Sequence, residues 1–152
     1  MKKNILLILT VFGALLFSNC KKSKNDDLNN ISYGTSFGMC GGYCSQSILI
    51  SDSKLSFSKS KNGAVPDTKT CSKSISEAEV NSIKDLLNTN QISNLPEVIG
   101  CPDCADGGAE WVSVTVNGKK YKITYDFGKP PKELEAAVAK LKVLKDGFKD
   151  CN

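Results

Sequence analysis

Residues 110–126 constrain the fold of this chain more than any other segment. Two runs in which apolar and polar residues alternate, 110–116 and 119–126, flank the dipeptide Asn117-Gly118. Asn-Gly is a preferred centre of the two-residue type I′ turn, because both positions of that turn require a positive φ. The loop length sets the register and gives an antiparallel hairpin with one apolar face. The pairs that it predicts are Val116 with Lys119, Val114 with Tyr121, and Val112 with Ile123.

Trp111 falls on the other, polar face of this hairpin, together with Ser113, Thr115 and two lysines. A large aromatic side chain on a polar face is expected either to be covered by other residues or to bind a partner. We expect the loop of residues 101–108 to cover the indole. The alternative is that Trp111 marks a partner surface.

The remaining apolar patterns predict further strands and two helices. Strands are expected at residues 31–35, 45–51, 55–59 and 68–74. Ser76-Glu77-Ala78-Glu79 has the form of a capping box, which opens a helix that runs to about residue 89. Pro130-Pro131 presets the start of a second helix, and Gly147 follows its end. The apolar stripes of the two helices are Val80, Ile83, Leu86 and Leu87, and Leu134, Ala137, Val138, Leu141 and Leu144.

This order of strands and helices, without a glycine-rich βαβ fingerprint, indicates the α+β class. The predicted architecture is an antiparallel sheet with two helices packed on one face, stapled by disulfides. Residues 31–152 are enough for a single domain that buries its own core.

The N-terminal segment has the pattern of an export signal. Lys2 and Lys3 precede an uncharged run from residue 5 to residue 17, and Cys20 follows just before a polar stretch. The run is shorter than the roughly 20 residues that a membrane-spanning helix requires. The segment resembles the bacterial lipobox, which implies removal of residues 1–19 and lipidation of Cys20, with palmitate as a typical acyl chain. An ordinary secretory signal that leaves Cys20 as a plain thiol is the alternative.

Residues 20–30 are then expected to form a flexible tether between the lipid and the domain. After Cys20 this stretch is polar, and Leu28 is too little apolar surface to pack against anything. The domain is expected to begin at residue 31.

Six further cysteines are an even number in a chain that is expected to be exported. An oxidising compartment then favours up to three disulfides, for which six cysteines allow 15 connectivities. We expect two local pairs, Cys40–Cys44 and Cys101–Cys104, and one long-range pair, Cys71–Cys151.

Cys101-Pro102-Asp103-Cys104 also has the CxxC spacing of thiol oxidoreductases. Residues 105–108 are a poor helix start, and nearby aspartates would raise the pKa of a thiol, so a structural disulfide is the favoured interpretation. Two metal sites are weaker alternatives, because thiolates in an oxidising compartment are oxidised more readily than metallated, and the acidic residues do not match the EF-hand spacing. Zinc could take Cys40, Cys44, Cys101 and Cys104, and calcium could take Asp103, Asp106 and Glu110, although a solvated acidic turn is the simpler interpretation of these acids.

Histidine and arginine are absent, and the positive charge comes entirely from 20 lysines, which 16 acidic residues nearly balance. Without histidine, Ser-His-Asp and Cys-His catalytic sites are excluded, and the commonest metal ligand is lost. Without arginine, the bidentate contacts that read bases and clamp phosphates are lost. We therefore expect no enzymatic activity, no cofactor, no metal and no nucleic-acid partner.

Four motifs occur together along the chain. They are Cys40-Gly41-Gly42-Tyr43-Cys44 leading into Ile48 and Ile50, the helix opened by Ser76, the Asn117-Gly118-Lys119 hairpin, and the segment from Tyr125 to Leu134. In this combination the chain resembles a family of short bacterial envelope lipoproteins whose domain has no assigned function. The resemblance covers about residues 31–146 and carries no catalytic residue across, and Cys71, Cys101, Cys104 and Cys151 are additional to the family pattern.

The patterns predict a protein anchored by lipid in the bacterial cell envelope, at the outer membrane. Its expected function is that of a binding or interaction module, with an envelope protein or a glycan as partner. The alternative is a thiol-disulfide redox or metal-handling protein that uses Cys101 and Cys104.

Overall fold

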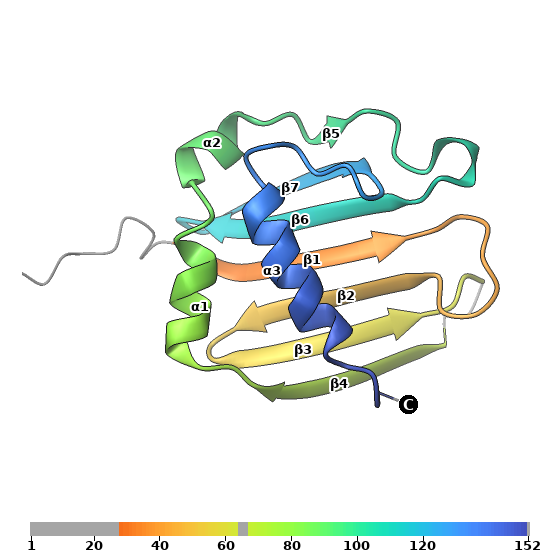
Figure 1. The fold of residues 1–152 in the computed structure, drawn as a ribbon, viewed down its shortest axis with the longest axis horizontal. Coiled ribbons are helices and arrows are strands. Elements are labelled where there is room, and N and C mark those ends of the chain that lie inside the picture. Colours follow the sequence, from red (N-terminus) through yellow and green to blue (C-terminus); the bar gives the residue numbers. More distant parts are fainter. Residues whose placement is uncertain (1–27, 64–66, 152) are drawn as a thin grey trace, which may run out of the picture.

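The computed structural model describes residues 28–63 and 67–151, which form one sheet of seven strands and three α-helices (Figure 1). The strands are β1 (Leu28–Ser36), β2 (Ser45–Ser51), β3 (Lys54–Ser60), β4 (Thr68–Ser74), β5 (Val98–Ile99), β6 (Ala109–Val116) and β7 (Lys119–Asp126). The helices are α1 (Glu77–Lys84), α2 (Thr89–Asn94) and α3 (Glu135–Asp146), with a short 3-10 turn, η1 (Cys104–Asp106). The order of strands across the sheet is β4-β3-β2-β1-β6-β7-β5.

The α+β class is confirmed, but the sheet is mixed rather than purely antiparallel. All neighbouring strands pair antiparallel except β5, which lies parallel to β7 at the edge of the sheet. The strand β5 has only two residues. Two residues are too few to show an alternating pattern, which is why the sequence did not predict this strand.

The predicted hairpin is confirmed in its turn and in its register. Asn117 and Gly118 both have positive φ, 50° and 77°, as the type I′ turn requires. Val112 pairs with Ile123 across β6 and β7, and the other two predicted pairs are also present. The strands expected at residues 45–51 and 68–74 are confirmed as β2 and β4.

The first strand begins earlier than predicted, at Leu28, inside the stretch that was expected to be tether. Leu28 is fully buried and pairs with Val116 of β6. One apolar side chain is enough here because β6 supplies both a hydrogen-bonding edge and an apolar neighbour. The expectation that residues 28–30 are flexible is therefore wrong, while Cys20 and the rest of the predicted tether lie outside the described residues.

The helix predicted from residue 76 to about residue 89 is divided into two. Ser76 caps α1 as predicted, since its side chain accepts a hydrogen bond from the Glu79 amide. The helix ends at Lys84, and Asn88 then caps α2 by accepting hydrogen bonds from the Asn90 and Gln91 amides. Because of this break, Leu86 is 38% exposed, although it was expected on the buried face.

Buried residues of the strands and of the three helices form a single core cluster. Figure 1 shows α3 crossing the sheet, where it contacts β1 and β2. Alternate strand residues such as Tyr33 and Ile48 form one buried cluster with Ile83 of α1 and Leu141 of α3. Among the described residues, none of the helices has the length and apolar character needed to cross a membrane.

Candidate functional site

The described residues contain three disulfides, and they are the three pairs expected from the sequence. Cys40–Cys44 closes the loop between β1 and β2, and Cys101–Cys104 closes the loop between β5 and β6. Cys71–Cys151 joins β4, at one edge of the sheet, to the chain beyond α3. This long-range bond closes over a sequence separation of 80 residues, and the chain-entropy model assigns about 4.5 kcal/mol to such a loop.

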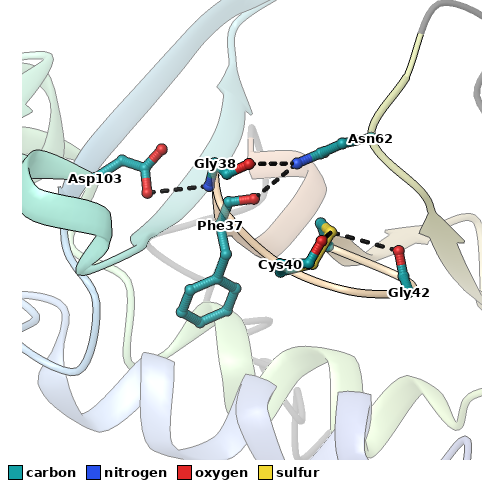
Figure 2. The surroundings of a disulfide bond; sticks show 7 residues. Phe37, Gly38, Cys40, Gly42, Asn62 and Asp103 are labelled. Atoms are coloured by element: carbon teal, nitrogen blue, oxygen red, sulfur yellow. Dashed lines mark hydrogen bonds between the residues drawn. A yellow bond between two sulfur atoms is a disulfide. The ribbon is translucent and has the colours of Figure 1, made fainter.

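The two local disulfides lie in loops at the same end of the sheet, and hydrogen bonds connect these loops to each other (Figure 2). The Asn62 side chain, from the loop between β3 and β4, donates to the carbonyl oxygens of Phe37 and Gly38 at 3.0 and 2.9 Å. From the other side, the Asp103 carboxylate accepts a hydrogen bond of 3.2 Å from the Gly38 amide. The three loops therefore hold one another in place.

The Cys101–Cys104 loop lacks the surroundings of a reactive thiol pair. Both cysteines are exposed, but the loop that contains them has only the three-residue turn η1 as helical structure. The Asp126 carboxylate accepts a hydrogen bond of 2.9 Å from the Cys101 amide, so negative charge lies beside the first cysteine. A helix N-terminus or a cation would favour a thiolate, whereas a carboxylate disfavours it.

The sequence alternatives for metal sites are not assembled. Cys40 and Cys44 are bonded to each other, and so are Cys101 and Cys104, so these sulfurs do not form a tetrahedral set. In the part of the chain that the structure describes, no group of three or more histidine, cysteine or acidic residues is placed to hold a metal ion. Glu110, grouped with Asp103 and Asp106 as a calcium alternative, lies apart from the loop.

Glu110 is 3% exposed, so the expectation of a solvated acidic turn is wrong for this residue. The Tyr33 hydroxyl donates to one oxygen of its carboxylate, and the Gly128 amide donates to the other at 3.0 Å. Burial, reinforced by the Glu110 carboxylate, raises the pKa of Tyr33, which therefore remains protonated and able to donate. Glu110 and Val112 lie two residues apart in β6, so their side chains are on the same face of the sheet. This alternation could have placed Glu110 on the core side from the sequence.

Tyr125 lies opposite Glu110 in β7 and is fully buried. Burial also raises its pKa. Among the described residues its hydroxyl has no hydrogen-bond partner, unlike that of Tyr33. The carboxylate is thus held by Tyr33 and the backbone, in a place closed to solvent, and it acts as a structural group.

Trp111 has a different environment from the one expected. The indole lies across Gly34 of β1, the residue that pairs with Trp111 in the β1–β6 ladder. A Cβ atom at position 34 would lie only 2.4 Å from Cζ2 of the indole, so this position requires glycine. The Lys122 ammonium lies 4.7 Å from the centre of the indole ring. Gly34 within a strand was the sequence signal for this close approach, and it was missed.

Trp111 also lines an open hollow of about 500 Å³ on the polar side of the sheet, which we call the Trp111 hollow. The indole is partly exposed there and lies over Gly34 of β1, and no residue of 101–108, the loop expected to cover it, lines the hollow. The hollow spans four adjacent strands and contains no carboxylate. Its lining residues are Asn30, Ser32, Leu49, Trp111, Ser113, Thr115, Lys120 and Lys122.

Ser82 and Lys140 form a hydrogen bond between α1 and α3. A serine and a lysine can form a catalytic pair only if the lysine takes the hydroxyl proton. Here the Ser82 hydroxyl donates at 2.6 Å to the carbonyl oxygen of Glu79, and the lysine donates to the hydroxyl oxygen. The pair therefore links two helices and does not activate a nucleophile.

No protein-family model matches the chain, and no curated protein matches its sequence.

The two buried tyrosines offer a matched test of the Glu110 cluster. Tyr33→Phe removes a hydrogen bond to a buried carboxylate and should lower the free energy of unfolding by about 1.5–3 kcal/mol. Tyr125→Phe removes a hydroxyl without a partner and should be neutral or stabilising. Urea unfolding of both variants measures the difference, and equal losses would contradict the assigned roles.

Proposed function

We propose that this protein is a lipid-anchored binding module of the bacterial cell envelope, and that the Trp111 hollow is its binding surface. The observation that carries the proposal is the exposed part of a large aromatic side chain in an open hollow outside the core. Aromatic side chains at such places commonly provide the anchor of a binding site.

The distribution of apolar residues supports the assignment of this surface. The buried cluster takes Tyr33, Val112 and Ile123 from one side of the strands, together with residues of the helices. Alternation places Ser32, Trp111 and Lys122 on the opposite side. We infer that the helices cover one face of the sheet and leave the face that carries the hollow free for a partner.

The rigidity of the scaffold also supports a binding role. The hollow lies over β2, β1, β6 and β7, of which β2, β1 and β6 are paired on both sides, while β7 is paired with β6 along its length and with β5 at its end. A surface that is already fixed in its binding geometry loses little conformational entropy when a partner binds. The tethered loops at one end of the sheet and the Cys71–Cys151 bond add to this preorganisation.

The position of the anchor is compatible with access to the hollow. Leu28 follows Cys20 by eight residues, which can span at most about 26 Å when fully extended. Asn30, two residues after Leu28, already lines the hollow. A lipid on Cys20 would therefore hold the hollow near the membrane, and the end with the two disulfide-closed loops would point away from it.

The anchor is tested by intact mass. We expect the mature protein from a membrane fraction to begin at Cys20 and to carry acyl mass on that residue, and the Cys20→Ala protein to leave the membrane fraction. Stable anchoring requires more than one acyl chain, because each buried CH₂ contributes about 0.8 kcal/mol. A Cys20→Ala protein that stays with membranes in full yield would contradict the lipid anchor.

The binding surface is tested by affinity capture from detergent-solubilised envelope. Trp111→Ala should abolish capture of a specific partner, whereas Phe127→Ala, an exposed aromatic outside the hollow, should retain it. Because the indole is only partly buried, the variant should lose less stability than the about 3–5 kcal/mol typical of a buried tryptophan. Circular dichroism confirms that both variants are folded, and unchanged capture by Trp111→Ala would reject this surface.

A thiol-disulfide function of Cys101 and Cys104 is the second candidate, favoured by the exposure of both cysteines. Because carboxylates surround this loop, we expect the native protein to be inactive in reduction of insulin with dithiothreitol. We also expect Cys101→Ser/Cys104→Ser to capture the partner normally. If the native protein catalyses insulin reduction and the double-serine variant does not, the redox function is favoured over binding.

A further inference from the structure

We propose that the ligand of the Trp111 hollow is a chain of acidic sugars. This ligand class rests on the binding function proposed above and follows from the charge and the hydrogen-bonding groups of the hollow. The hollow combines two lysines with several hydroxyl and amide groups around the partly exposed indole.

The charge of the hollow is one-sided. Lys120 and Lys122 line it, and no acidic residue does. None of the ion pairs found within residues 28–63 and 67–151 involves either lysine. Glu97 adjoins both of them in a neighbouring hollow on β7, without forming an ion pair with them. Two ammonium groups without carboxylate partners complement a ligand that carries negative charge.

The position of Lys122 gives the ligand a specific contact. Its ammonium lies over the indole of Trp111, 4.7 Å from the ring centre. A cation–π contact at an exposed site is weak, whereas a hydrogen bond between an ammonium and a carboxylate is among the stronger polar contacts. An acidic group in the hollow would therefore draw Lys122 away from the ring and expose the indole face to the ligand.

The other lining groups favour a sugar over an acidic protein. Ser32, Thr115 and Asn30 offer hydroxyl and amide groups, while Trp111 and Leu49 are the only large apolar side chains. The centres of protein interfaces are rich in apolar and aromatic residues and depleted of lysine. A ligand that carries a hydroxyl on most of its carbons matches this lining better.

The strand pairing limits one common mode of peptide binding at this place. A peptide that adds to a sheet as a further strand needs an unpaired edge. The strands β2, β1 and β6 are paired on both sides, whereas β5 covers β7 only at Thr124 and Tyr125 and leaves an edge beside Lys120 and Lys122. A ligand that fills the whole hollow must therefore lie on the face of the sheet and use side-chain contacts.

Trp111 is the only tryptophan of the chain, so its fluorescence reports directly on the hollow. The probes are trigalacturonate, its neutral methyl ester and a sulfated heparin tetrasaccharide, each added to the full lipid-free domain at low salt. Poly-glutamate of similar charge serves as the acidic-protein probe. Isothermal titration gives each affinity independently of the indole.

At least one acidic sugar should change the tryptophan fluorescence saturably. The affinity of the methyl ester should be lower by a factor of about ten or more, because the ester lacks charge-assisted contacts. Lys120→Gln/Lys122→Gln should cause a similar loss. The matched control Lys132→Gln/Lys142→Gln removes the same charge from exposed positions outside the hollow and should bind as the parent does. Added salt should weaken binding of the acidic sugars.

Three results would overturn the inference. Equal binding of trigalacturonate and its methyl ester would show that charge is not recognised. If poly-glutamate binds more tightly than both acidic sugars, the ligand is an acidic protein rather than a sugar. Failure of both acidic sugars to bind would remove the ligand class altogether, while loss of envelope capture by Trp111→Ala would still support the binding function itself.

Discussion

The fold depends on the pairing of β1 with β6. The strands β1 to β4 form one antiparallel meander, β6 and β7 form a separate hairpin, and the β1–β6 ladder is the contact that joins them into one sheet. Two successive pairs of this ladder, Gly34 with Trp111 and Thr35 with Glu110, have unusual partners on opposite faces. On one face glycine makes room for an indole, and on the other a buried carboxylate accepts a hydrogen bond from Tyr33.

This ladder also explains why the Trp111 hollow has a fixed shape. The indole rests on the backbone of β1, so its position is set by the register of the two strands rather than by a loop. A shift of register by one residue would move Trp111 to the core side and Glu110 to solvent. The buried Tyr33–Glu110 contact opposes such a shift, because an unpaired buried carboxylate is costly. The structural group on one face thereby helps to fix the Trp111 hollow on the other.

The loops at the far end of the sheet are held by a different set of contacts. Two short disulfides, the Asn62 side chain and the Asp103 carboxylate connect segments that are distant in the sequence. In this context Cys101–Cys104 acts as one of several loop restraints. The carboxylate next to Cys101 supports a structural bond, and these contacts together hold the loops in one geometry.

The sequence by itself determined the local elements whose signals lie within a few residues. The Asn117-Gly118 turn fixed a hairpin and its register, Ser76 fixed a helix start, and the number of cysteines together with their local spacing indicated the disulfides. The tertiary structure decided which strands meet. Four contacts join residues that are far apart in the chain. They are the burial of Leu28 against β6, the pairing of β5 with β7, the hydrogen bond between Tyr33 and Glu110, and the packing of Trp111 on Gly34. Such contacts leave no local periodicity, because their energy comes from neighbours that only the folded sheet supplies.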